Sequence, residues 1–421
     1  MAFEANFTNK YKILNDPIYG FISIPSELIF DLIEHPYFQR LRRITQLGLT
    51  YLVYPGAYHT RFHHAIGAMH LMQRAVSILR SKGHDITPEE EEAVYVAILL
   101  HDIGHGPFSH ALEFTLVRNV NHEQLSTLFM ERLNAQFDGK LTTAIQIFKN
   151  EYPKRFLNEL ISSQLDMDRL DYLRRDSFYT GVTEGAINSE RLLTMLNIAN
   201  DRLVVDAKGI YSVEKFIVAR SLMYWQVYLH KTVLSAEFML VNVLQRAKEL
   251  AAEGIEIHGT TALRTFMYED PTYDEFMNST TLLDTFAHLD DFDIMASIKE
   301  WCNHSDRVLS DLSRRIVERR LFKIEIRRDP FNEDYVNEIR TQTQALFGFT
   351  SDEASYYIIE KMTANDIYKA GDSQIRLLYK DGRVTDVAED ADQLNLKALQ
   401  TSVKRHFICY PKEVGPVDLP K

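Results

Sequence analysis

The chain has 421 residues, 45% of them hydrophobic, and a formal net charge of −12 at pH 7. A chain of this length can bury a large core, as one helical domain with an appendage or as two domains. The acidic balance argues against a general nucleic-acid-binding surface, because contacts to a phosphate backbone need concentrated Lys and Arg. Nucleic acid is therefore not an expected partner.

The sequence carries no membrane or export signal that we can recognise. Its longest apolar stretch, Ala93 to Leu100, is far shorter than a membrane span, and the first residues lack the layout of a signal peptide. Cys302 and Cys409 are too few for a disulfide framework. We expect a soluble cytoplasmic protein that makes no membrane contact.

The first 250 residues predict a short hairpin followed by helices. Residues 1–25 alternate apolar and polar side chains around Asp16-Pro17 and Gly20, which favours a β-hairpin. The segment Thr87-Pro88-Glu89-Glu90 is typical of a helix start, with an N-cap, a first-turn proline and first-turn acids. Apolar residues recur with a helical period in six segments: 27–34, 64–80, 89–102, 123–134, 155–175 and 213–250.

The remaining chain is mixed. Residues 255–300 are acidic and predict short helices joined by loops, with no catalytic signal. The last hundred residues predict a β-α-β-β-α-β order, in which a turn at Lys380-Asp381-Gly382 joins two strands. We therefore divide the chain into a hairpin segment (1–25), a helical domain (26–254), a helical connector (255–320) and an α+β lobe (321–421).

An adjacent His101-Asp102 pair ends an apolar helix, in the run Leu-Leu-His-Asp-Ile-Gly-His-Gly-Pro. A buried imidazole beside a buried carboxylate is costly unless something satisfies both, and a divalent metal does so. Two other segments, 59–67 and 165–172, each add His or Asp residues at a helix. Two imidazoles and two carboxylates suit one divalent ion, Mn, Fe, Zn, Ni or Mg.

These motifs resemble those of the HD-domain phosphohydrolases. Within that superfamily the chain is most similar to deoxynucleoside triphosphate triphosphohydrolases, which include bacterial dGTPases and a vertebrate enzyme with a SAM domain before its HD domain. The resemblance runs from about Lys10 to Leu250 and includes four further matching segments: 15–20, 38–42, 46–48 and 105–110. It implies a mainly α fold, an HD helical bundle with a small C-terminal α+β lobe.

The resemblance also implies a role for individual residues. His64, His101, Asp102 and Asp168 would be the metal ligands. His122 would donate a proton to the leaving 5′-oxygen, held by Glu113, with His105 in the same layer of catalytic residues. Glu113 departs from the Asp found in similar enzymes by one methylene.

The helical spacing and the resemblance also indicate which residues would contact the substrate. Asp168, Tyr172 and Asp176 share one helical face, with Arg169 beside it. The resemblance assigns phosphate contacts to Arg61, His110, Arg169 and Arg220, sugar contacts to Tyr172 and Asp176, exclusion of a 2′-hydroxyl to Tyr228, and the base pocket to Gln46 and Leu47. Glu34, Gln39 and Arg42 fall where the vertebrate enzyme binds a regulatory nucleotide between subunits, but Glu34 replaces an Asp there, so a nucleotide effector stays an open alternative. We expect a homo-oligomer.

Three functions remain open at this point. The first is a metal-dependent enzyme that cleaves a (deoxy)nucleoside triphosphate to nucleoside and tripolyphosphate. The second is another HD-type activity, a nucleotide monophosphatase or a phosphodiesterase. The third is a nucleotide-sensing module without catalysis. Several candidate phosphate contacts favour a triphosphate, and a complete ligand set favours an enzyme.

Overall fold

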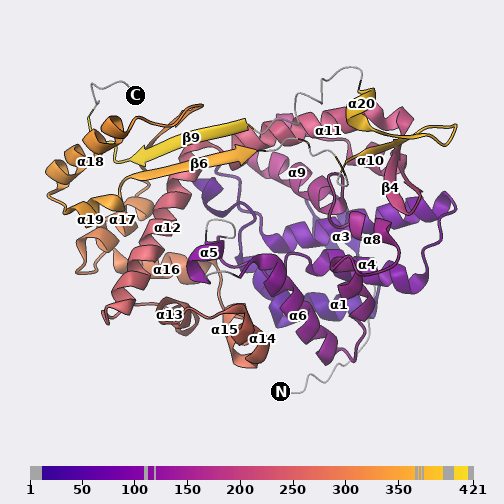
Figure 1. The fold of residues 1–421 in the computed structure, drawn as a ribbon. Helices are drawn as coiled ribbons and strands as arrows, with labels where there is room; N and C mark the ends of the chain where they lie inside the picture. Colours follow the sequence, from indigo (N-terminus) through magenta and orange to yellow (C-terminus); the bar gives the residue numbers. More distant parts are fainter. Residues whose placement is uncertain are drawn as a thin grey trace.

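A computed structural model describes residues 12–108, 112–117, 120–365, 368, 371, 374–391 and 403–415. The fold is mainly α, with small sheets at its periphery (Figure 1). Within these residues no single helix has the length and apolar character needed to cross a membrane. One bent pair, Ala207–Tyr228 with Lys231–Ala252, passes that test by length and composition when taken together.

Helices account for most of the described chain. The α-helices are α1 (Glu27–Glu34), α2 (Pro36–Gln39), α3 (Arg61–Ser81), α4 (Pro88–Leu100), α5 (Glu113–Leu116), α6 (His122–Gln136), α7 (Thr142–Phe148), α8 (Arg155–Glu159), α9 (Met167–Thr180), α10 (Ser189–Met195), α11 (Ile210–Met223), α12 (Lys231–Ala252), α13 (Thr261–Tyr268), α14 (Tyr273–Asn278), α15 (Thr280–Ala287), α16 (Asp291–Trp301), α17 (Arg307–Val317), α18 (Glu333–Phe347), α19 (Ser351–Ser355) and α20 (Val387–Asp390). Short 3-10 helices are η1 (Arg40–Arg43), η2 (Gly48–Leu52), η4 (Thr183–Gly185) and η5 (Ala207–Gly209), and η6 (Tyr224–Tyr228) is a π-helical turn.

The strands form three sheets. They are β1 (Ile13–Asp16), β2 (Gly20–Ser23), β3 (Leu196–Ala199), β4 (Arg202–Asp206), β5 (Lys323–Arg327), β6 (Ile359–Asn365), β7 (Arg376–Leu378), β8 (Val384–Asp386) and β9 (Val403–Tyr410). β1 and β2 pair as a hairpin, the second sheet has the order β3-β4-β7-β8, and the third has the order β5-β9-β6. All pairs are antiparallel except β4 with β7.

The expected mainly α fold is confirmed, and several local predictions hold. The hairpin forms at β1 and β2, and Thr87 caps α4 by accepting a hydrogen bond from the Glu90 backbone N–H. Two long helical segments are broken instead. Asp166 accepts the backbone N–H groups of Ser163 and Arg169, which ends the turn before α9 and starts that helix anew. The His230 side chain accepts from Thr232 N and begins α12 after the π-helical turn.

The C-terminal strands are arranged differently from our expectation of one β-α-β-β-α-β unit. β7 pairs in parallel with β4, at Val205 opposite Leu377, so the β7–β8 hairpin extends a sheet begun by residues 196–206. Figure 1 shows α20 beside β4 and α10, away from β6, β9 and α18. Alternation along a strand gives its face but not its partner, so the sequence could not assign this pairing.

The crossing of α3 and α9 positions the functional site. Gly67 on α3 lies against Asp171 and Arg175 on α9, and a Cβ at residue 67 would overlap both side chains. Asp171 and Arg175 form a buried ion pair, with Nε 2.9 Å from Oδ2. Arg175 also contacts Asp16 at the end of β1, at 2.8 Å. The hairpin, α3 and α9 therefore meet at one buried guanidinium.

We predict that Gly67→Ala destabilises the fold. Alanine gains about 1 kcal/mol of helix propensity, but separating a buried ion pair costs about 3–5 kcal/mol, so the free energy of unfolding should fall by about 2–4 kcal/mol. Chemical denaturation followed by circular dichroism measures this. Ser77→Ala, at an exposed position of the same helix, should change it by less than about 0.5 kcal/mol. A Gly67→Ala protein as stable as the parent would contradict this account of the crossing.

Candidate metal centre

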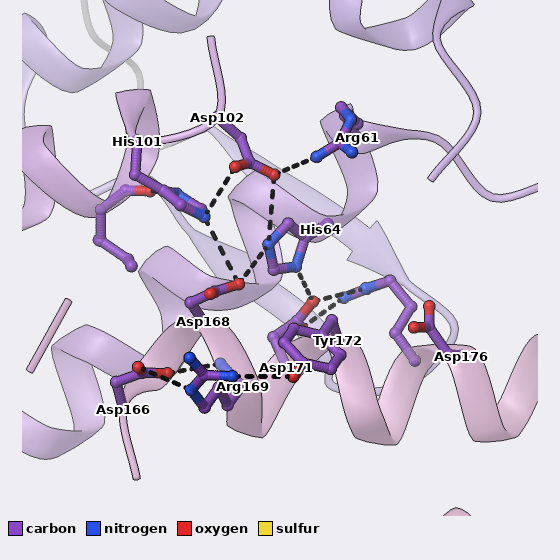
Figure 2. A network of polar contacts seen from close by, with 12 residues as sticks. Arg61, His64, His101, Asp102, Asp166, Asp168, Arg169, Asp171, Tyr172 and Asp176 are labelled. Atoms are coloured by element: carbon purple, nitrogen blue, oxygen red, sulfur yellow. Dashed lines mark hydrogen bonds and ion pairs between the residues drawn. The ribbon is translucent and has the colours of Figure 1, made fainter. Parts of the chain in front are cut away.

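Three helix ends bring the expected ligands together. Thr60 caps α3 in a reciprocal arrangement with His63, which places Arg61 and His64 in the first turn. His101 is the C-cap of α4, and Asp102 follows it. Asp166 caps α9 and so places Asp168 in the first turn of that helix. Figure 2 shows His64, His101, Asp102 and Asp168 directed toward one another from these elements.

The donor atoms of His64, His101 and Asp168 are close enough to share one ion, and Asp102 lies beside them, with a different oxygen toward each imidazole. Asp168 Oδ1 lies 3.0 Å from His64 Nε2 and 3.5 Å from His101 Nε2. Asp102 Oδ1 lies 3.4 Å from His101 Nε2, and its Oδ2 lies 3.8 Å from His64 Nε2. The donor atoms of His64, His101 and Asp168 all lie within 4.8 Å of one another. A metal about 2.0–2.2 Å from each donor requires similar separations.

The imidazole rings are oriented for metal binding by their other nitrogens. His64 Nδ1 donates to Asp171 Oδ2 at 2.8 Å, and His101 Nδ1 donates to the Ile98 carbonyl at 2.6 Å. In the neutral form of each ring the Nε2 atom would therefore carry the lone pair that a metal needs, and both Nε2 atoms are buried with the Asp168 carboxylate as a near neighbour. An outer acceptor that fixes the ring tautomer is the usual support for a metal-ligating histidine. These residues fit a divalent metal.

The electrostatics of the group also favour a cation. Burial lowers the pKa of His64, but the Asp168 and Asp171 carboxylates outweigh it and raise that pKa to about 10. Burial likewise opposes the charged form of His101, whose pKa is nevertheless raised by Asp102 and Asp168. Burial raises the pKa of Asp168, but His101 and His64 hold it below its ordinary value. The pocket thus stabilises positive charge, which a metal supplies.

A second histidine group lies beside the metal ligands. His105 Nε2 is 3.3 Å from Asp102 Oδ1, and the His105 and His122 rings stack with centroids 3.9 Å apart. His122 Nδ1 donates to Glu113 Oε1 at 2.5 Å, and Glu113 also accepts the His122 backbone N–H at 2.9 Å. Burial and then Arg61 hold the pKa of His105 well below its ordinary value, although Asp102 opposes them. The expected pairing of His122 with Glu113 is present.

The expected substrate residues of α9 face the same region. Arg169 NH1 donates to the Tyr172 hydroxyl at 3.3 Å, and the Tyr172 ring lies 6.4 Å from that of His64. The Tyr228 hydroxyl donates to Asp176 Oδ2 at 2.7 Å, and Asp176 Oδ1 lies 2.7 Å from His59 Nε2. Asp176 therefore already has two partners in this structure.

The remaining expected residues are more dispersed. Arg61 donates to Asp102, and Arg220 donates to the Gln164 carbonyl at 3.2 Å. Gln46 lies in the segment before η2 and has a buried side-chain oxygen without a partner among the described residues, while Leu47 packs against the core. His110 lies outside the described residues. In the candidate effector group, Arg42 donates to Gln39 at 2.8 Å, and Glu34 partly offsets the burial that lowers the Arg42 pKa.

Several supporting residues were not predicted from the sequence. Asp171 accepts from His64 Nδ1 and from Arg175 Nε, and the i, i+4 spacing of Asp171 and Arg175 on the helix that carries Asp168 was the available signal. Arg40 is fully buried and donates to the carbonyls of Ile103 and His105, at 2.8 and 2.6 Å. Asp291, in the connector that carried no catalytic signal, accepts the backbone N–H groups of Thr45 and Phe108, both at 2.8 Å. No local pattern reveals such a long-range contact.

Comparisons with known proteins agree with this geometry. Residues 61–176 match the HD domain family, and residues 187–266 match the HD associated region. The protein YwfO of Bacillus subtilis is 32% identical over 98% of this chain and 95% of its own length. The crystal structure of a phosphohydrolase from Bacteroides thetaiotaomicron has 52% sequence identity and a TM-score of 0.92, over 95% of this chain and all of that chain.

The fold and the family matches place the chain in the HD class, and its His and Asp cluster fits a divalent metal. The chain belongs to the HD-domain phosphohydrolase superfamily. A protein described as a deoxynucleoside triphosphate triphosphohydrolase SAMHD1 homolog, from Dictyostelium discoideum, is 31% identical. That similarity covers 56% of this chain and 50% of the relative. The zebrafish SAMHD1 protein is 28% identical over 57% of this chain and 46% of its own length.

We predict that Asp168→Ala lowers metal occupancy. Removing this carboxylate takes away the oxygen that approaches both imidazole nitrogens and leaves less negative charge to hold the ion. Elemental analysis of purified protein should show about one divalent metal per chain in the parent and a large loss in the variant. Asp274→Ala, at an exposed position of α14, serves as the control. Full metal occupancy in Asp168→Ala would exclude Asp168 as a ligand.

Proposed function

We propose that this protein is a metal-dependent triphosphohydrolase that cleaves deoxynucleoside triphosphates to nucleoside and tripolyphosphate. The observation that carries the proposal is the adjacency of two groups: the candidate ligands His64, His101, Asp102 and Asp168, and the His122–Glu113 pair, which meets them through His105. The partial similarity to proteins described as deoxynucleoside triphosphate triphosphohydrolases supports this choice of substrate.

Cationic side chains near the cluster favour a highly anionic substrate. Arg61 contacts the candidate ligand Asp102, and Arg169 follows Asp168 on α9. Arg220 is held beside the segment that precedes α9 by its bond to Gln164. Charge-assisted contacts from guanidinium groups bind phosphate oxygens strongly. Three such groups on an acidic protein suit a triphosphate better than a monophosphate.

In the proposed reaction a water oxygen attacks the α-phosphorus and the bond from that phosphorus to the 5′-oxygen breaks. A divalent metal held by the four ligands would polarise a phosphoryl oxygen and lower the pKa of a water molecule. His122 protonates the leaving 5′-oxygen from Nε2, because its Nδ1 is bonded to Glu113. Glu113 fixes the orientation of the ring during this transfer.

The sugar is selected by the tyrosine and aspartate group. Tyr228 is tied to Asp176, and the Tyr172 and Tyr228 rings lie 6.2 Å apart. Two fixed rings beside the ribose would crowd a 2′-hydroxyl and leave it without a partner, which disfavours a ribonucleotide. The homo-oligomer and the cytoplasmic location expected from the sequence stay predictions, and the nucleotide effector stays an open alternative.

We predict that His122→Ala lowers the turnover rate about 10²–10⁴-fold, the usual effect of losing a general acid. Metal content should be unchanged, because His122 lies outside the ligand cluster. Glu113→Gln should lower the rate less, since the amide oxygen still accepts from His122 Nδ1. Steady-state kinetics together with elemental analysis make the test. A His122→Ala enzyme within a few-fold of the parent would remove His122 from the mechanism.

The nature of the product tests the proposed reaction itself. Metal-loaded protein incubated with each deoxynucleoside triphosphate should yield nucleoside and tripolyphosphate, separated by ion-exchange chromatography. Asp168→Ala protein prepared in parallel controls for contaminating phosphatases. Orthophosphate from a nucleoside monophosphate, with triphosphates untouched, would instead indicate an HD-type monophosphatase. Equal turnover of ATP and dATP would contradict the role of Tyr228 in excluding a 2′-hydroxyl. The proposed reaction itself would still stand.

A further inference from the structure

The single helical turn α5 carries Glu113, the carboxylate that binds His122. Glu113 is the first residue of α5, and its Oε1 accepts the His122 backbone N–H at 2.9 Å and His122 Nδ1–H at 2.5 Å. A helix of four residues is about 6 Å long. A movement of the C-terminal end of so short a helix therefore moves Glu113 as well, and with it the contact to His122.

The hydrogen bonds within α5 are too few to hold it in place. The last four carbonyl groups of a helix have no partner inside that helix, and α5 has only four residues. Its N-cap is Leu112, which cannot supply the side-chain acceptor that Ser, Thr, Asp or Asn gives at that position. One isolated turn is also unstable in water. The position of α5 thus depends on contacts with other elements, among them the buried side chains of Leu112 and Leu116.

Lys248 of α12 binds the C-terminal end of α5, which lies beside α12 in Figure 1. Its Nζ atom donates to the carbonyl oxygens of Thr115 at 3.4 Å and Leu116 at 3.2 Å. It also donates to Asp270 Oδ1 at 3.3 Å, in the link between α13 and α14. A cationic side chain at a helix C-terminus supplies donors to the last carbonyls and complements the helix dipole.

The charge of Lys248 is buried, although packing alone does not require a charge there. Its side chain is 10% exposed, whereas that of Asp270 is 40% exposed. Burying an ammonium group is unfavourable unless polar contacts compensate it, and an apolar side chain of similar volume often fills such a space equally well. Apolar burial is non-directional, however, whereas hydrogen bonds to carbonyl oxygens have a preferred direction. Lys248 therefore adds a directional hold that Leu112 and Leu116 do not give.

We propose that Lys248 is a positioning residue for His122, which acts through α5 and Glu113. Lys248 binds one end of the helical turn, and Glu113 at the other end binds His122. Holding the first contact holds the second, because both lie on the same turn. The link from Lys248 to His122 does not depend on the reaction, whereas its effect on turnover rests on the proposed function, in which His122 is the general acid.

Hydrogen exchange at the His122 amide tests this link without substrate. The amide is bonded to Glu113 and exchanges when that bond opens. In metal-loaded full-length protein labelled with nitrogen-15 at histidine, Lys248→Met should raise the exchange rate about tenfold or more, because it removes charged donors. Lys248→Arg, which keeps charged donors, should stay within about threefold of the parent. A parent-like exchange rate in Lys248→Met would overturn the proposal.

Arg246 on the same helix provides a matched control. Its NH2 atom lies 2.6 Å from Asp306 Oδ2, and its side chain is 19% exposed. Arg246→Met thus removes a comparable ion pair, which links α12 to the N-cap of α17 instead of to α5. It should lower the free energy of unfolding but leave the His122 exchange rate unchanged. An equal rise in both variants would show that any loss from α12 loosens the site, and Lys248 would then have no specific role.

Steady-state kinetics with deoxynucleoside triphosphates test the effect on turnover. Lys248→Met should lower kcat about tenfold, as expected for a misplaced acid, with KM and metal content unchanged. Lys248→Arg should restore most of the rate. In a Glu113→Ala background, Lys248→Met should cause no further loss, because the link acts through Glu113. A full additional loss there would contradict the proposal.

The two measurements separate this proposal from the proposed function. If the protein is not a triphosphohydrolase, the parent and all variants fail to cleave triphosphates, while the changes in His122 exchange persist. If Lys248 has no positioning role, the parent cleaves triphosphates and Lys248→Met matches it in both His122 exchange and kcat.

Discussion

The candidate metal centre depends on the buried ion network around His64 Nδ1, where α3 crosses α9. Asp171 accepts from His64 Nδ1 and from Arg175, and Arg175 reaches Asp16 in the N-terminal hairpin. Breaking a buried pair by removing one member costs several kcal/mol, because the remaining charge stays uncompensated. The network therefore fixes the spacing of α3 and α9, and with it the direction in which His64 presents Nε2. The lack of a side chain at Gly67 is the steric condition for this arrangement.

The segment from Ile103 to Phe108, on the side of the site away from Asp171, is fixed by a different set of contacts. Arg40 and Asp291 bind backbone groups of the segment from Ile103 to Phe108, which connects Asp102 to the histidine group. Phe108 has a φ of 49°, a conformation that non-glycine residues rarely adopt. Such a conformation persists where surrounding contacts over-determine it. The connector thus contributes to the site through Asp291 rather than through a reacting group.

The C-terminal residues contribute at a third side, through the sheet β3-β4-β7-β8. Because β7 joins β4 rather than β6 or β9, Arg376 lies beside Glu159 and Arg202, which precede it by some 170 residues or more. The turn at residues 162–165 separates this arginine group from Arg169 and Arg220. A segment expected to form a separate lobe is therefore part of the surroundings of the proposed active site.

The sequence by itself determined the class of fold, the helix that begins after Thr87 and the residue types of the candidate metal cluster. These follow from local periodicity, capping and the spacing of His and Asp, together with the resemblance to a known superfamily. Only the tertiary structure decided that His64 rests on Asp171, that Asp291 holds the segment beside His105, and that β7 pairs with β4. Each of these is a contact between residues far apart in the chain. Packing and buried charge set its geometry, and local sequence patterns carry no information about either.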